Sequence, residues 1–291
     1  MAKSVVGVIG GSGVYALDGL VDMREERIES PWGEPSDVLR FGRLGATDCV
    51  FLARHGQGHR LSPSSINYRA NIDILKRAGV NDILAISACG SFRREYYPGL
   101  FVLADQFIDR TFKRETSFFG TGCVAHVPFS HPVSPDLRER VALAAMAEGI
   151  AFKEGGTYVC MEGPQFSTLA ESLLYQAQGA DVIGMTAATE AKLAREAEIP
   201  YGLIAMVTDY DCWHEEHGIV DVEAVLKVVR DNAAKANALV ARVLADFPAE
   251  PPPCRHGSRH ALDGAIMTAP AARDPALLAK LDAVAGRVLR G

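Results

Sequence analysis

The segment Val5-Val6-Gly7-Val8-Ile9-Gly10 is a short apolar run that ends in glycine, and Gly11-Ser12-Gly13 continues it as a tight turn. Such a run, bounded by glycine, is typical of a buried strand. Further apolar runs follow at 49–53, 83–86, 181–185 and 199–207. Segments with helical character lie between and after them, at 65–78, 138–148, 170–178, 187–197 and 222–247. This alternation predicts an α/β fold, a single domain with a central mixed, mostly parallel β-sheet flanked by helices.

The chain changes character near its C-terminal end. It has 291 residues, which allows one large domain or two small ones. The segment 247–253 contains three consecutive prolines, which cannot continue a helix. We therefore divide the chain into a domain at 1–250 and an appendage at 251–291 with a helix at 277–289. The appendage is too small to fold alone, so we expect it to pack on the body or on a neighbouring subunit.

Composition excludes several classes of protein. The net charge is 30 − 36 = −6, and there is no dense run of Lys and Arg, so a general nucleic-acid binder is not expected. No apolar stretch approaches the ~20 residues that span a bilayer, and the first apolar run is too short for a signal peptide. None of the six cysteines forms a CxxC pair. We expect reduced thiols in a cytoplasmic protein without membrane partners.

Five predicted strands end in small, hydroxyl-bearing, cationic or acidic residues. These ends are Gly10–Gly13, Arg54–Gly56, Ser87–Ser91, Met185–Thr186 and Asp209–Asp211. Each of them alone fits a tight turn or a solvated loop as well as it fits a binding site. Because α/β proteins bind ligands at the carboxyl ends of parallel strands, their recurrence predicts one composite pocket. Histidine pairs at 55 and 59 and at 214 and 217 lie in glycine-rich or polar loops, so we predict no metal site.

Eight segments, in this order, resemble the trimeric purine nucleoside phosphorylases. They are 8–13, 53–56, 67–72, 87–91, 105–111, 162–167, 184–186 and 208–213, and the resemblance runs from about residue 5 to 245. It implies phosphorolysis, in which inorganic phosphate attacks C1′ of a purine nucleoside and releases the free base. It implies no cofactor and no metal, with phosphate as co-substrate and a homotrimer with shared active sites as the assembly.

The resemblance also implies a role for individual residues. The phosphate-binding residues are Ser12, Arg54, His55, Ser87, the backbone of Ala88, and Thr186. The nucleoside-binding residues are His126, Phe166, Ser167, Met185, Asp209, Asp211, Val220, Val222 and Leu226. Asp209 is the expected general acid toward purine N7, and Asp211 accepts from the exocyclic 6-amino group. His126 comes from the neighbouring subunit.

Three features bear on the substrate. The family members that act on 6-oxopurines typically carry asparagine where this chain has Asp209, so a 6-aminopurine is expected. The apolar residues Val220, Val222 and Leu226 suit a 5′-methylthio group, so the implied substrate is 5′-methylthioadenosine. Alternatives are a phosphorylase of the same fold for adenosine, methylthioinosine or 6-oxopurine nucleosides, and a non-catalytic purine nucleoside-binding protein. One departure is Thr189, which replaces a family proline and is expected to loosen the start of its helix.

Overall fold

The computed structural model describes residues 3–10, 17, 19–215 and 222–290. In this part of the chain, eleven strands form one mixed sheet. The strands are β1 (Val5–Gly10), β2 (Val21–Glu26), β3 (Leu39–Leu44), β4 (Thr47–Ala53), β5 (Asp82–Ser91), β6 (Phe101–Leu103), β7 (Gln106–Asp109), β8 (Phe152–Glu154), β9 (Thr157–Cys160), β10 (Val182–Gly184) and β11 (Tyr201–Asp209). The main order is β2-β3-β4-β1-β5-β10-β9-β7, while β11 pairs with β5 and β6, and β6 pairs with β8. Among the described strands, six of the ten pairings are parallel, so the predicted mixed, mostly parallel sheet is confirmed.

The central strand β5 has three strand partners, and this creates an opening in the sheet. β11 pairs with β5 from residue 83 to residue 90, which occupies one edge almost completely. The other edge is shared, because β1 pairs with residues 82–85 and β10 pairs with residues 90–91. Residues 86–89 of β5 therefore have no strand partner on that edge within the described chain. Side chains bond to part of the backbone in this interval, because Arg54 donates to the carbonyl of Ile86 and Thr208 donates to the carbonyl of Cys89.

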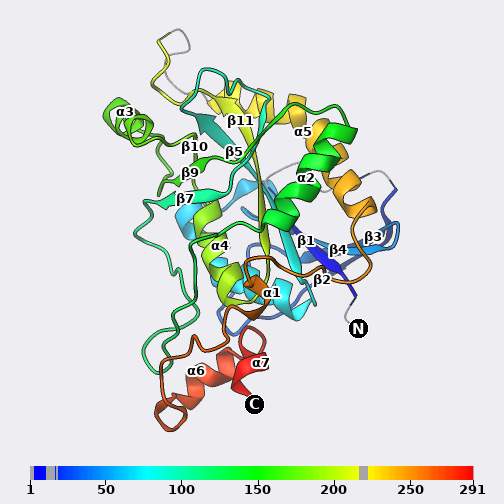
Figure 1. Cartoon of the computed structure of the whole chain (residues 1–291), viewed down its shortest axis with the longest axis vertical. Helices are drawn as coiled ribbons and strands as arrows, with labels where there is room; N and C mark the ends of the chain where they lie inside the picture. Colours follow the sequence, from blue (N-terminus) through cyan, green and yellow to red (C-terminus); the bar gives the residue numbers. More distant parts are fainter. Residues whose placement is uncertain (1–2, 11–16, 18, 216–221, 291) are drawn as a thin grey trace.

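Helices cover both faces of the sheet (Figure 1). The helices are α1 (Tyr68–Arg77), α2 (Pro135–Ala147), α3 (Leu169–Ala177), α4 (Ala187–Glu196), α5 (Val222–Ala245), α6 (Pro275–Lys280) and α7 (Gly286–Leu289). Helices α1 and α4 share one apolar core with Leu203 and Val207 of β11, whereas α2 and α5 share a second core with Ile204 and Met206. Side chains alternate between the faces of a strand, so one strand supplies both cores.

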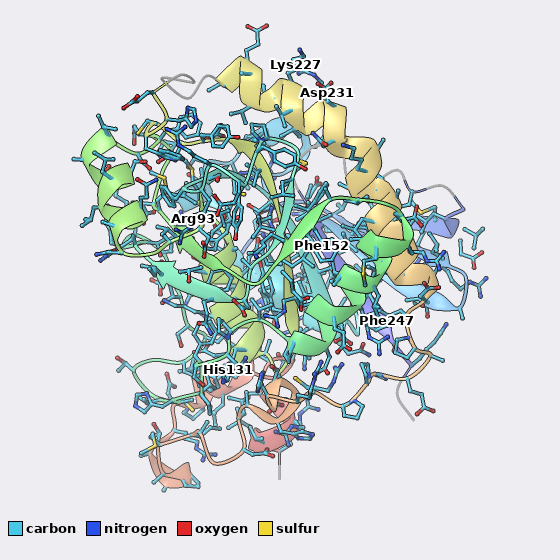
Figure 2. All side chains as sticks on the ribbon, turned by 45° about the horizontal axis from the view of Figure 1, so that its top comes forward. Arg93, His131, Phe152, Lys227, Asp231 and Phe247 are labelled. Atoms are coloured by element: carbon cyan, nitrogen blue, oxygen red, sulfur yellow. The ribbon has the colours of Figure 1, made fainter. Side chains whose placement is uncertain are left out.

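Helix α5 is amphipathic along its length. Lys227 and Asp231 lie on its outer side (Figure 2), and both are exposed. Its buried residues include Leu239 and Val243, which belong to the core shared with α2. The first turns of the helix extend toward the tip of the sheet, where they reach the pocket described below. None of the described helices is long and apolar enough to cross a membrane.

The C-terminal segment packs on the body of its own chain. Arg259 donates two hydrogen bonds of 2.8 Å to the carboxylate of Asp82, and Leu262, Leu281 and Val284 are buried in the core that contains α1 and α4. Helices α6 and α7 lie at the end of the molecule opposite α3 (Figure 1). The single helix predicted at 277–289 is wrong, because a turn at 281–285 separates two short helices and carries Leu281 and Val284 into the core.

Candidate active site

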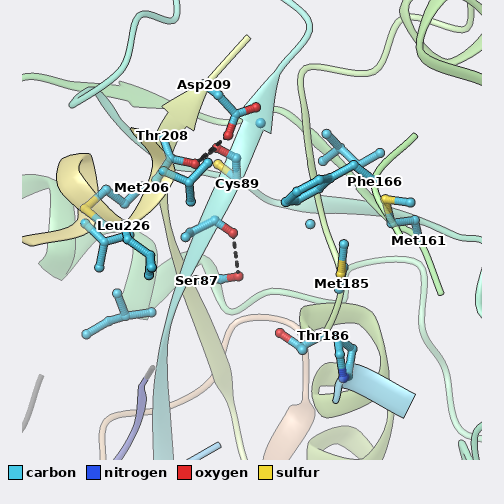
Figure 3. A pocket seen from close by; sticks show the side chains of 18 of the residues that line it. Ser87, Cys89, Met161, Phe166, Met185, Thr186, Met206, Thr208, Asp209 and Leu226 are labelled. Atoms are coloured by element: carbon cyan, nitrogen blue, oxygen red, sulfur yellow. Dashed lines mark hydrogen bonds between the residues drawn. The ribbon is translucent and has the colours of Figure 1, made fainter. Parts of the chain in front are cut away.

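One pocket lies beside the open interval of β5. It has a volume of about 280 Å³, and its walls come from the ends of β4, β5, β10 and β11, from the loop at 161–166, and from α5. Thr186 and Ser87 lie at one end of the pocket, and Asp209 lies at the other (Figure 3). The two ends are named here for the ligands that the family resemblance implies: the phosphate end consists of Arg54, His55, Ser87, Ala88 and Thr186, and the base end consists of Asp209 and Asp211. The predicted convergence of strand ends on one pocket is seen for β4, β5, β10 and β11.

Arg54 is the most firmly held residue of the phosphate end. Its guanidinium is 2% exposed and forms a two-point ion pair with Glu190 of α4, in which Nη2 lies 3.0 Å from Oε2. Nη1 donates to the carbonyl of Ile86 at 2.9 Å, and the Tyr201 hydroxyl donates to Glu190 Oε2 at 2.9 Å. Burial alone would lower the pKa of Arg54, but the Glu190 carboxylate outweighs this and raises it. Arg54 is therefore a permanent cation whose remaining N–H groups can bind an anion.

Hydroxyls and a helix terminus complete the phosphate end. Thr186 is the N-cap of α4, yet its side chain makes no capping hydrogen bond, and it is buried against the pocket. The Ser87 hydroxyl donates to the carbonyl of Ala88 at 3.1 Å, and Ala88 itself is exposed in the open interval of β5. The N-terminus of a helix favours negative charge through its free N–H groups. This combination of donors can hold an oxyanion.

His55 contributes a neutral imidazole. Its Nδ1 lies 2.9 Å from the carbonyl oxygen of Leu61, and its ring stacks on His59 with centroids 4.1 Å apart. Burial, reinforced by the neighbouring Arg54 cation, lowers the pKa of His55 to about 4. The ring is therefore uncharged at neutral pH.

Two carboxyl groups form the base end, and no cation lies beside them in the described part of the chain. Asp209 Oδ2 accepts from the Thr208 hydroxyl at 2.7 Å, and Oδ1 accepts from the backbone N–H of Asp211 at 2.8 Å. Burial raises the pKa of Asp209. Burial also raises the pKa of Asp211, and the charge of Asp209 adds to this effect. Gly90 is required here, since a Cβ at this position would lie 2.8 Å from Asp209 Oδ1. Such an environment favours a protonated carboxyl group that can act as an acid.

The middle of the pocket is apolar. Met185 and Phe166 form one wall and Met206 and Leu226 the opposite wall (Figure 3). Val225 and Val229 of α5 also line it, although sequence reasoning did not select them. The sequence feature that could have identified them is their spacing of four residues, which places both on one face of the predicted helix. Aliphatic and thioether side chains here can accept a sugar with an apolar substituent.

The remaining predicted residues are not in the lining of this pocket as the structure describes it. Ser167 and Val222 do not line it, although a hydrogen bond with Ser167 helps to lower the pKa of Asp211 at its base end. Ser12 and Val220 lie outside the described residues. His126 is exposed, and its backbone N–H donates to the carbonyl of Ala265 in the C-terminal segment at 2.9 Å. It does not line the pocket of its own chain.

A buried arginine that the sequence did not reveal supports the wall around Met185. Arg114 donates to the carbonyl oxygens of Met185 and Glu162, the latter at 2.7 Å, and lies 3.4 Å from the hydroxyl of Thr189. Thr189, which we expected to loosen the start of α4, is fully buried and supplies this acceptor instead of a proline ring. The threonine thus links α4 to the loop at 161–166 through Arg114.

Comparison with known proteins gives consistent matches. The family model described as the phosphorylase superfamily matches residues 5–245. The S-methyl-5′-thioadenosine phosphorylase of Bradyrhizobium diazoefficiens is 65% identical over 291 residues, which is 100% of both chains. A crystal structure of methylthioadenosine phosphorylase from an antarctic soil metagenomic library has a TM-score of 0.91 at 41% identity, covering 98% of this chain and 99% of that chain. A mutant adenosine/methylthioadenosine phosphorylase from Schistosoma mansoni, in complex with methylthioadenosine, has a TM-score of 0.79 at 37% identity and covers 86% and 93%.

Proposed function

This chain belongs to the phosphorylase superfamily, and we propose that it catalyses the phosphorolysis of 5′-methylthioadenosine to adenine and 5-methylthioribose 1-phosphate. One observation carries the proposal: two buried carboxyl groups with raised pKa values lie at the opposite end of one pocket from a buried, permanently charged arginine. An anion that attacks at one end and a base that departs at the other match this separation of charge. The enzyme is thus a pentosyltransferase with inorganic phosphate as co-substrate and without a cofactor.

The chemistry follows from the two ends. A phosphate oxygen attacks C1′ of the ribose while the bond between C1′ and purine N9 breaks, through a transition state with oxocarbenium character. The phosphate end holds the nucleophile in position, which supplies much of the rate by proximity. Asp209 donates its proton to purine N7, so the base leaves without a full negative charge. The raised pKa of Asp209 supports this role, because the acid must be protonated at the moment of departure.

Asp211 supports a preference for 6-aminopurines. Its Oδ2 atom is buried and has no hydrogen-bond partner among the described residues. An acceptor without a donor is costly in a buried site, and the exocyclic amino group of adenine would satisfy it. A 6-oxo group presents another acceptor at this position. A site built for one hydrogen-bond pattern rejects the other strongly.

The 5′ substituent is the finer part of the proposal. Met206, Val225, Leu226 and Val229 give the pocket an apolar wall, and no polar side chain of α5 lines it among the described residues. A 5′-hydroxyl would lose hydrogen bonds against such a wall, whereas a methylthio group would not. Adenosine is the second candidate substrate, since the relative from Schistosoma mansoni is named for both nucleosides.

We also propose that the enzyme is a homotrimer with shared active sites, as the family resemblance implies. His126 lies on an exposed loop away from its own pocket, where a neighbour can use it. Phe166, Leu169, Leu173 and Leu174 form an exposed apolar group on and before α3, with exposed fractions of 42–54%. Contiguous apolar patches often mark interfaces between proteins. We further propose that the protein is cytoplasmic and that its six cysteines, which are free in the structure, stay reduced there.

The test is a substrate panel. Purified protein is incubated with methylthioadenosine, adenosine, methylthioinosine and inosine, each with and without phosphate, and free base is measured. We expect phosphate-dependent release of adenine, fastest from methylthioadenosine. Base release at the same rate without phosphate would indicate hydrolysis. Equal rates on inosine would contradict the roles of Asp209 and Asp211, and no release would favour a binding protein.

A second experiment tests the assembly. His126→Ala should raise the KM for nucleoside, and a protein that is active while light scattering shows a monomer would refute shared sites.

A further inference from the structure

Arg114 lies directly behind the pocket wall that contains Met161 and Met185. Its side chain is 1% exposed and is not part of the pocket lining. One terminal nitrogen, Nη1, donates to the carbonyl oxygen of Met185. The other, Nη2, donates to the carbonyl oxygen of Glu162 at 2.7 Å and lies 3.5 Å from that of Met161. Met161 follows β9 and Met185 follows β10, so one guanidinium joins the ends of two neighbouring strands.

Glu162 supplies the counter-charge and ties Arg114 to further segments. Its Oε1 atom lies 3.4 Å from Arg114 Nε and also accepts from the Ser64 hydroxyl. Its Oε2 atom accepts from the backbone N–H groups of Phe112 at 2.6 Å and Lys113 at 3.2 Å. Burial would raise the pKa of Glu162, but these hydrogen bonds and the Arg114 charge together lower it. Arg114 is therefore a paired cation whose position is fixed within the protein.

The wall in front of Arg114 depends on the main chain that Arg114 holds. Met161, Phe166 and Met185 line the pocket from the same side (Figure 3). Gly163 leaves room for this arrangement, since a Cβ at this position would lie 2.5 Å from Met185 Sδ. Met161 and Met185 thus contribute their side chains to the pocket, while their carbonyl oxygens face Arg114. Because methionine side chains are flexible, the wall keeps one shape only if the main chain behind it is fixed.

We propose that Arg114 is a positioning residue for the nucleoside: its planar guanidinium fixes the carbonyl oxygens of Met161 and Met185, and thereby holds this wall in the conformation that binds the sugar and the base. The inference rests on the proposed function, which places the nucleoside against this wall. A wall that is already ordered does not lose conformational freedom when the ligand binds. Lysine would keep the charge next to Glu162, but its single ammonium group cannot reproduce the planar fork that reaches both strands. Replacement by lysine therefore separates the positioning role from the charge.

The experiment compares Arg114→Lys with Arg259→Lys by calorimetric titration with methylthioadenosine in the absence of phosphate. Arg259 is a matched control because it also bonds to a buried carboxylate, that of Asp82, and to two carbonyl oxygens, those of Asn81 and Pro252. Its partner Asp82 lies at the start of β5, whereas the pocket lies near the end of that strand. Arg114→Lys should weaken binding of methylthioadenosine about 10-fold, the effect expected from the loss of one or two hydrogen bonds, and Arg259→Lys should change it by less than about 2-fold. The same affinity in both variants, with folding confirmed by thermal melting, would overturn the proposal.

Steady-state kinetics separates positioning from a general loss of structure. In Arg114→Lys the KM for nucleoside should rise about 10-fold while the KM for phosphate stays within about 2-fold, because Glu190 holds Arg54 through bonds that do not involve Arg114. Equal increases in both KM values would indicate a merely structural role. If Arg114→Lys does not fold, Thr189→Val decides, since it removes only the acceptor 3.4 Å from Nη1 and should raise the KM for nucleoside about 2-fold. An unchanged KM for nucleoside in that variant would overturn the proposal.

Failure of this inference and failure of the proposed function give different results. If the chain binds methylthioadenosine without phosphorolysis, and Arg114→Lys still weakens binding, the proposed function fails and the present inference holds. If phosphorolysis is observed and Arg114→Lys has no more effect on binding than Arg259→Lys, the present inference fails alone. A wild-type chain that binds no methylthioadenosine would overturn both.

Discussion

The two ends of the pocket contain buried ionisable groups that are stabilised in opposite ways. At the phosphate end, the Arg54 cation is compensated by Glu190, whose carboxylate also accepts from Tyr201. At the base end, Asp209 and Asp211 have no cationic partner among the described residues, and burial raises the pKa of both. At the first end the buried charge is compensated without a ligand, whereas the second end has a buried carboxylate oxygen, Asp211 Oδ2, without a hydrogen-bond partner among the described residues.

This difference indicates which end of the site lowers the stability of the fold. A paired charge inside a protein contributes to the fold as long as both partners are present. Unpaired carboxyl groups in a dry site oppose folding, and they persist where catalysis needs a raised pKa. Removal of a charge should therefore have opposite effects on stability at the two ends. The predictions below test this contrast, beginning with the largest effect.

The largest effect on catalysis is expected from Asp209→Asn. The amide cannot release a proton to purine N7, so the rate on 6-aminopurine nucleosides should fall by roughly 10²- to 10⁴-fold. Steady-state kinetics with methylthioadenosine measures this. Because a buried carboxyl group is replaced by a neutral group of the same shape, the variant should remain folded and melt no lower than the parent at pH 7. An unchanged rate would place the general acid elsewhere.

The next effect concerns stability. Glu190→Gln leaves the Arg54 charge buried without a counter-charge, which should reduce the free energy of unfolding by roughly 3–5 kcal/mol. Denaturant titration measures this, and the KM for phosphate should rise while the KM for nucleoside changes little. The matched control is Glu196→Gln on the same helix. Glu196 is buried, and among the described residues its carboxylate accepts hydrogen bonds from the Ser117 hydroxyl and the N–H of Phe118 and has no cationic partner. Burial raises its pKa to about 7, so its replacement should be much milder. Equal losses in both variants would contradict the contrast.

The sequence predicted those residues of the two pocket ends that directly follow a strand. Arg54, Thr186 and Asp209 each follow an apolar run, and the meeting of strand ends at one sheet edge brings them together. Glu190 and Tyr201 lie inside a helix and a strand, where a charged or aromatic residue has no local signature of function. Their roles arise from packing, because the contact of α4 with β11 brings Glu190 and Tyr201 together, and Arg54, 136 residues before Glu190 in the sequence, meets them only in the fold.

The fold was predictable to a similar degree. Strands β1, β5 and β11 are buried over most of their length, so their apolar runs identify them. All six residues of β2 are exposed, and it therefore shows no apolar run at all. Strands β6 and β8 have only three residues each, too few for a periodic pattern. The opening in β5 depends on pairing of β10, which runs antiparallel to it, and the sequence does not specify this register.

A smaller effect, with the opposite sign for stability, is expected from Asp211→Asn. Folding raises the pKa of Asp211, so the folded state binds the proton more tightly and loses stability as the pH rises from 3.8 through the raised value. Above the raised pKa this loss is complete, and there the neutral amide should raise the melting temperature. The gain should vanish below pH 3.8. Asparagine tolerates the positive φ of 52° at this position. A lower melting temperature above the raised pKa would contradict this account.

The same variant should change substrate specificity. The amide of Asp211→Asn can donate to a 6-oxo group, so the preference for methylthioadenosine over methylthioinosine should fall about 10-fold.

The smallest effect is expected from Tyr201→Phe, which removes one hydrogen bond to Glu190 and keeps the ion pair with Arg54. The cost should be about 1 kcal/mol in the free energy of unfolding, with a modest increase in the KM for phosphate. The double variant with Glu190→Gln provides the decisive measurement. If Tyr201 acts by orienting the Glu190 carboxylate, the effect of Tyr201→Phe on the KM for phosphate should largely disappear once Glu190 is replaced, because the two residues act through the same ion pair. Strictly additive effects on the KM for phosphate would show that Tyr201 only fills space beside α4.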